Sequence, residues 1–125
     1  MRSVARSLPA LWRAEKVQKK AAKAGFDWQD YTGALTALHG ELREFEEAVA
    51  NSGDAAGELG DILFSAVNVA RFFDIDPEEA LGAASDKFIS RFTRAEIMAQ
   101  DRGRRLEDMS LDEMEAFYQQ AKLEE

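Results

Sequence analysis

The sequence contains no cysteine and only two prolines among its 125 residues. Without cysteine the chain can form neither a disulfide framework nor a thiolate metal site, and it fits a reducing compartment, so we expect a cytoplasmic protein. No stretch approaches the ~20 apolar residues of a membrane-spanning helix, so no membrane partner is expected. The length and the 46% content of hydrophobic residues predict a single domain, residues 1–125, with a real core.

Positive charge is scarce outside the N-terminal segment. The net charge is −8, yet residues 1–25 hold seven Lys/Arg against Glu15 alone, which leaves nine Lys/Arg and 23 Asp/Glu in the remainder. Affinity for nucleic acid comes largely from neutralising phosphates, so this acidic body argues against stable nucleic-acid binding. We interpret the basic N-terminal segment as a solvated helix face. A role in attracting a polyanion is the alternative.

Alternating strand patterns are also absent, whereas apolar residues recur with a spacing near 3.6 throughout the chain. Capping sequences at Asp54, Asp76 and Ser110 mark helix starts. The expected helices run from 7–9 to 25, from a cap at Asp27 to 51–53, from 55 to 73, from 77 to 102–103, and from 111 through 118. Short connections make neighbouring helices antiparallel, so we predict an all-α fold, an antiparallel bundle of four to five helices.

The third expected helix is apolar on most sides between Ile62 and Phe73. A helix of this kind must be covered all round, and four or five short helices barely provide that cover. A second copy of the chain would supply it. We therefore expect a homodimer.

Four acids stand on two neighbouring helices of this prediction. Glu41 and Glu44 are three residues apart, as are Glu58 and Asp61, so each pair projects from one helix face. A turn at residues 50–54 folds the helices back to back, which allows the two pairs to converge at the edge of the core.

Converging carboxylates in a partly dry place repel one another, so either some are protonated or a cation lies between them. Oxygen-only ligands favour a hard ion, Mg²⁺ or Mn²⁺. The alternative is that acids near helix starts simply complement the helix dipole. That alternative suits Glu58, but it suits Glu41 and Glu44 poorly because both lie well inside their helix.

The pattern Glu41-x-x-Glu44, thirteen residues, then Glu58-x-x-Asp61 resembles the metal motif of the all-α nucleoside triphosphate pyrophosphohydrolases, the MazG family. The segments "SLPALWRAEKVQKKAAKAGFDW" (7–28), "GELGDILFSAVNVAR" (57–71) and "SDKFISRF" (85–92) are similar to the catalytic, C-terminal-type domain of that family. The resemblance covers nearly the whole chain. It implies a helical dimer that uses Mg²⁺, with Mn²⁺ as the alternative, to hydrolyse a nucleoside triphosphate at the α-phosphate, releasing a monophosphate and pyrophosphate.

The resemblance also implies roles for individual acids. The metal ligands of the family correspond to Glu41, Glu44, Glu58 and Asp61. One carboxylate must accept a proton from the attacking water, and Glu41 and Glu44 are the two candidates as catalytic base. Nothing in the sequence separates them.

Three further residues are candidate substrate contacts. The phosphate-binding Lys and Arg of the family correspond to Lys87 and Arg91, whose i, i+4 spacing places both cations on one helix face. Surface pairing with Asp86 or Glu96 is the alternative. Trp28 could stack on a nucleobase, although a tryptophan at a helix start is more often part of the core.

The sequence departs from the family pattern at several positions. Gly40 stands where a second acid usually precedes the motif, Ala37 and Asp54 replace basic residues, and Ser85 replaces a common Asn. These departures favour an alternative function: a catalytically weakened dimerisation or regulatory module that binds nucleotide or a partner without turnover. The opening "MRSVARSLPALW" resembles an interdomain linker followed by the domain, so residues 1–6 are expected to be linker-like and flexible.

Overall fold

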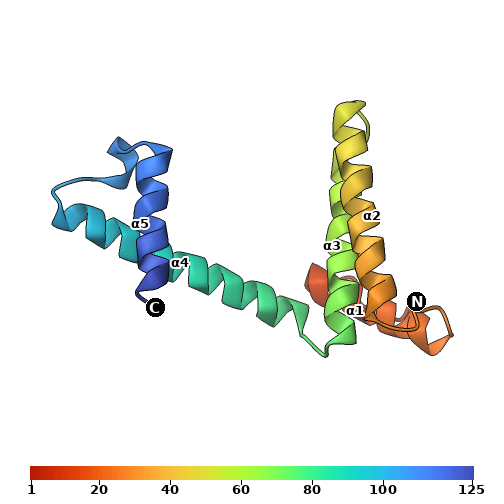
Figure 1. The fold of residues 1–125 in the computed structure, drawn as a ribbon. Helices are drawn as coiled ribbons and strands as arrows, with labels where there is room; N and C mark the ends of the chain where they lie inside the picture. The colour runs from red at the N-terminus through yellow and green to blue at the C-terminus, as the bar shows by residue number, and fades with distance from the viewer. The chain divides into compact units, whose positions relative to one another are not determined.

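The computed structural model describes residues 1–125, and all of its regular structure is helical (Figure 1). This confirms the all-α prediction with five α-helices; the short 3₁₀ helix was not predicted. No helix combines the length and the apolar character needed to cross a bilayer. The elements are α1 (Ala10–Lys23), α2 (Tyr31–Ala50), α3 (Ala55–Phe72), α4 (Pro77–Asp101), the 3₁₀ helix η1 (Leu106–Asp108) and α5 (Leu111–Leu123).

Helix starts follow the predicted caps in three cases. The Asp54 carboxylate accepts a hydrogen bond from the third amide of α3, at 3.0 Å. Asp76 accepts from the amides two and three positions further on, at 2.9 and 3.1 Å. Ser110 and Glu113 form a reciprocal capping box at the start of α5. Each cap satisfies backbone donors that the first helical turn leaves free.

The start of α2 differs from the prediction. Asp30, not Asp27, is the cap, and its side chain accepts from the amide of Thr32 at 2.9 Å. Asp27 is instead held by Arg71, at the C-terminal end of α3, through two hydrogen bonds of 2.5 and 3.0 Å. The predicted cap was wrong: α2 begins at Tyr31, so Asp27 lies three residues before the cap position, and its carboxylate pairs with Arg71 instead.

The chain forms two compact units, Met1–Ala80 and Leu81–Glu125, and their boundary lies in the first turn of α4. In the first unit α3 runs back alongside α2, and α1 packs against α3 (Figure 1). Two side-chain hydrogen bonds connect α1 with later parts of the chain. The Trp12 indole donates to Asp76 at 2.8 Å, and the Gln18 amide donates to the main-chain carbonyl of Phe64, on α3, at 2.9 Å.

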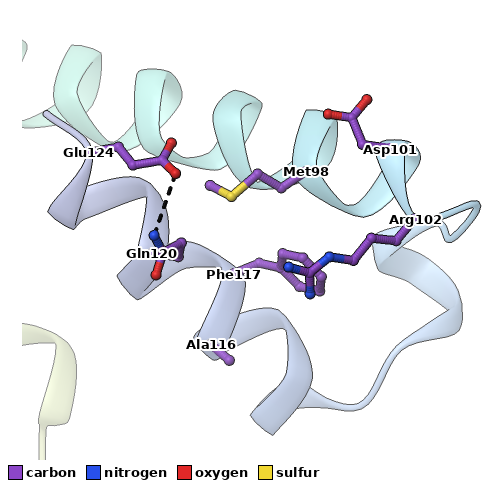
Figure 2. Close-up of a pocket in the computed structure, with 7 residues that line it drawn as sticks. All are labelled: Met98, Asp101, Arg102, Ala116, Phe117, Gln120 and Glu124. Atoms are coloured by element: carbon purple, nitrogen blue, oxygen red, sulfur yellow. Dashed lines mark hydrogen bonds between the residues drawn. The ribbon is translucent and has the colours of Figure 1, made fainter.

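In the second unit the end of α4, η1 and the start of α5 enclose a small core of Ala99, Leu106 and Met109. A cavity of about 390 Å³ lies between α4 and α5 (Figure 2). In its wall the Arg102 guanidinium lies over the Phe117 ring, 5.0 Å from the ring centroid.

Few large side chains are buried. The buried residues are mostly small, and no large side chain is fully enclosed. On α3, Leu59, Leu63 and Phe64 are 47%, 53% and 45% exposed. The apolar surface predicted to need cover is therefore left open by the chain itself.

Candidate metal centre

The α2–α3 hairpin positions the acids. Glu41 and Glu44 lie in the second half of α2, Glu58 lies in the first turn of α3, and Asp61 follows one turn later. The two helices pack closely, because the tight turn at residues 51–54 reverses the chain between them. The acids of both helices thus lie near the same end of the hairpin.

Three of the four acids meet. One carboxylate oxygen from each of Glu41, Glu44 and Glu58 lies within 4.8 Å of the other two. Asp61 lies outside this trio and is exposed, but its charge is close enough to raise the pKa values of Glu41 and Glu58. The structure therefore brings the predicted quartet together as a trio with a charged neighbour.

Two oxygens of the trio lack partners. Oε2 of Glu41 and Oε2 of Glu58 are shielded from solvent and accept no hydrogen bond from the protein. Such an atom costs free energy unless something satisfies it. The helix dipole cannot be that partner for Glu41, which lies in the interior of α2.

The pKa values of Glu41 and Glu58 reflect the same crowding of carboxylates. A hydrogen bond with Glu44 raises the pKa of Glu41, and burial and the surrounding carboxylates add to it. Burial raises the pKa of Glu58, followed by the charges of Glu44, Asp61 and Asp54. None of the ion pairs of the chain involves the trio or Asp61.

These observations test whether the residues fit a divalent ion. The donors are carboxylate oxygens only, two of them are buried without a partner, and no Lys or Arg neutralises them. A hard cation such as Mg²⁺ or Mn²⁺ prefers this donor set and would satisfy both orphaned oxygens. The trio fits such an ion.

The predicted phosphate contacts lie on α4, in the second unit. Arg91 pairs with Glu125 through hydrogen bonds of 2.6 and 3.0 Å, and this contact above all raises the pKa of Arg91. Lys87 is exposed, and its charge helps to lower the pKa of Glu125. Neither Asp86 nor Glu96 pairs with either cation. Glu125 was not anticipated, because it lies 34 residues from Arg91 in the sequence.

Trp28 is half exposed, at 49%, and lies against the first turn of α2. A Cβ added at Gly33 would lie only 2.9 Å from Cε3 of the Trp28 ring, so the ring occupies the space that any side chain at Gly33 needs. Trp28 also lines a cavity of about 370 Å³ together with Gln18 and Asn68. Neither of these two polar residues was predicted from the sequence to belong to a site.

Comparison with known proteins places this arrangement in a class. The profile of the MazG nucleotide pyrophosphohydrolase domain matches residues 29–94, more than half of the chain, and this segment contains all four acids. The chain belongs to the MazG nucleotide pyrophosphohydrolase domain family.

Two relatives share 37% identity with nearly the whole chain. One is the nucleoside triphosphate pyrophosphohydrolase/pyrophosphatase MazG of Thermotoga maritima, matched over 115 residues, which are 92% of this chain and 45% of the relative. The other is the nucleoside triphosphate pyrophosphohydrolase of Escherichia coli K12, matched over 126 residues, 98% of this chain and 48% of the relative. The chain thus spans about half the length of these relatives. A third, the uncharacterized protein YabN of Bacillus subtilis, is 52% identical over 65 residues, which cover 52% of this chain and 13% of YabN.

Proposed function

We propose that this chain is a divalent-metal-dependent nucleoside triphosphate pyrophosphohydrolase that cleaves a nucleotide at the α-phosphate to give a monophosphate and pyrophosphate. The observation that carries the proposal is the carboxylate trio of Glu41, Glu44 and Glu58 with its two orphaned buried oxygens. Family membership supports the reaction, and the printed names of two relatives state it for those proteins.

In this proposal Glu41, Glu44, Glu58 and Asp61 hold Mg²⁺, with Mn²⁺ as a substitute. When bound, the ion polarises phosphate oxygens and makes a water more acidic. Either Glu44 or Glu41 accepts the proton of that water.

The proposed substrate contacts are Lys87, Arg91 and Trp28. Arg91 presents Nε and Nη2 side by side to the two oxygens of Glu125, which is the fork geometry that guanidinium also uses on phosphate. A phosphate group can therefore replace this carboxylate without a change in the donor pattern. Lys87, one turn earlier, supplies a second positive charge to offset the charge of the leaving pyrophosphate.

We also propose that the working form is a homodimer. Leu59, Leu63 and Phe64 leave an apolar surface on α3 that the chain does not cover. A second copy that packs its own α2–α3 hairpin against this surface would bury apolar area on both sides, which is the main driving force for such association.

Product analysis tests the function. The chain is incubated with Mg²⁺ and each common ribo- and deoxyribonucleoside triphosphate in water enriched in ¹⁸O, and the products are resolved by mass. We expect a monophosphate that carries the ¹⁸O label and unlabelled pyrophosphate. Release of inorganic phosphate, label in the pyrophosphate, or no product with either Mg²⁺ or Mn²⁺ would overturn the proposal; the last result would favour the module without turnover.

Two variants and a matched control connect activity with the acids. Glu44→Gln and Asp61→Asn should abolish turnover while the circular dichroism spectrum stays helical. Glu47→Gln, which removes an exposed acid from the same helix outside the trio, should remain active. A large loss of helicity in the first two variants would show instead that these acids are structural.

A further inference from the structure

Three cations share one face of α4 in the second unit. Lys87, Arg91 and Arg94 are spaced by four and three residues, the spacing of a single helical face. Each step is about 5–6 Å along the helix axis, so a chain of phosphate groups lying along this face can contact more than one cation. The face concentrates positive charge in a chain whose net charge is −8.

Carboxylates of the chain itself already occupy two of these cations. Arg91 donates from Nε and Nη2 to the two oxygens of Glu125, at 2.6 and 3.0 Å. Arg94 donates from Nε to Glu124, the residue that caps the end of α5, at 3.0 Å. Both acids therefore stand where an anion from solution would bind.

Glu125 stands between Arg91 and the solvent. The side chain of Arg91 is only 14% exposed, whereas that of Glu125 is 45% exposed. The two donors of the guanidinium fork are satisfied by one carboxylate in a bidentate pair, the geometry that phosphate also uses. An anion from solution can gain both donors only when this carboxylate leaves.

Little else holds Glu125 in place. Helix α5 ends at Leu123, and the pair with Arg91 is the only hydrogen-bonded contact of Glu125, so its departure breaks no helical bond. Ion pairs with an exposed partner are weak, because water screens their charges. The hydrogen bond from Arg91, together with the charges of Lys87 and Lys122, lowers the pKa of Glu125, so the carboxylate stays ionised at neutral pH.

We propose that Glu125 is an internal competitor of substrate phosphate: it occupies Arg91 until a polyphosphate chain displaces it. A polyphosphate succeeds because it also reaches Lys87, one turn earlier, which forms no ion pair within the chain. An anion that contacts Arg91 alone gains only what Glu125 already supplies. The inference rests on the proposed function, since it describes how the phosphate contact named there is controlled.

Binding of inorganic pyrophosphate without metal tests the competitor. The full chain in EDTA is titrated with pyrophosphate, and the Nε–H resonance of Arg91, assigned with Arg91→Lys, is followed by NMR. The unmodified chain should respond. Glu125→Gln keeps the shape of the side chain and removes its charge, and it should bind pyrophosphate about fivefold more tightly, the factor expected when a part-exposed ion pair no longer has to be broken.

Glu115→Gln is the matched control. Glu115 is an exposed acid of α5 that accepts a hydrogen bond from Gln119 and pairs with no cation, and its substitution changes the net charge by the same amount. It should bind pyrophosphate as the unmodified chain does. An equal gain in Glu115→Gln, an unchanged affinity in Glu125→Gln, or no response of Arg91 in any form of the protein would overturn the proposal.

Turnover separates this inference from the proposed function. If triphosphates are hydrolysed while Glu125→Gln keeps the KM and the pyrophosphate affinity of the unmodified chain, the competitor is wrong and the function stands. If no triphosphate is hydrolysed but Glu125→Gln alone binds pyrophosphate more tightly, the competitor stands and the function is wrong. With both intact, Glu125→Gln should lower KM about fivefold and strengthen product inhibition by pyrophosphate to the same extent, with kcat nearly unchanged, because Glu125 is displaced on binding, before the chemical step.

Discussion

Binding of a divalent ion should stabilise this fold, and Glu58→Gln should remove that gain. Glu58 contributes a buried oxygen without a partner to the trio, so the metal-free protein holds like charges together with nothing between them. An ion at a hundred times its Kd stabilises the folded state by about 2.7 kcal/mol. For a chain of this length that corresponds to a rise in Tm of about 10 °C.

The metal-free protein should also respond to pH with a definite sign. The pKa values of Glu41 and Glu58 are raised above the usual 4.5 in the folded state, so the folded state holds more protons than the unfolded state as these groups titrate. Stability in EDTA should therefore fall as the pH rises from about 4.5 through the raised pKa values. The ion should reverse this trend, because it binds the ionised carboxylates and competes with protons.

The assay is thermal unfolding followed by circular dichroism, in EDTA and in Mn²⁺, from pH 4.5 to 8. The unmodified chain should gain stability from Mn²⁺ increasingly as the pH rises. Glu58→Gln should match or exceed the unmodified chain in EDTA and gain little from Mn²⁺, whereas Glu47→Gln should behave like the unmodified chain. Equal Tm values with and without Mn²⁺ at pH 8, or an equal gain in Glu58→Gln, would refute this reasoning.

Three substitutions test other parts of the structure. Gly40→Ala should stabilise α2 by about 1 kcal/mol in urea unfolding, because the nearest atom to an added Cβ is 3.8 Å away; a less stable variant would show that the space is not free. Asp54→Ala should cost about 1 kcal/mol by losing the cap of α3, and an unchanged midpoint would argue against that cap. Leu63→Glu places a charge on the uncovered surface of α3 and should turn a dimer into a monomer in light scattering; a mass equal to that of the unmodified chain would contradict the proposed interface.

Much of the fold follows from local signals. The caps at Asp54, Asp76 and Ser110 act on amides within three residues, so sequence alone suffices to locate these helix starts. Asp30 caps α2 through a local contact with the amide of Thr32, whereas Asp27 pairs with Arg71, 44 residues away. No local pattern predicts that pairing.

In the candidate site, too, some contacts could be predicted from the sequence and others could not. The i, i+3 spacing predicts which acids share a face. Of the four acids expected to converge, the structure brings oxygens of Glu41, Glu44 and Glu58 within 4.8 Å of one another and leaves Asp61 outside this group. The pairing of Arg91 with Glu125 is long-range and was not foreseen.

The cavity could have been suspected from one residue. Gln18 lies seven positions after Leu11, so a polar residue stands on the apolar face of α1. A buried amide at such a position requires partners, which is a reason to look for them.

Gly33, a costly residue inside a helix by propensity alone, is explained only by the Trp28 ring packed against it.

The most direct measurement is an anomalous-difference map from crystals grown with Mn²⁺. The account predicts a peak enclosed by the carboxylates of Glu41, Glu44 and Glu58, and no such peak in crystals of Glu58→Gln. Ordered protein without manganese among these side chains, or manganese bound equally well by the variant, would contradict it.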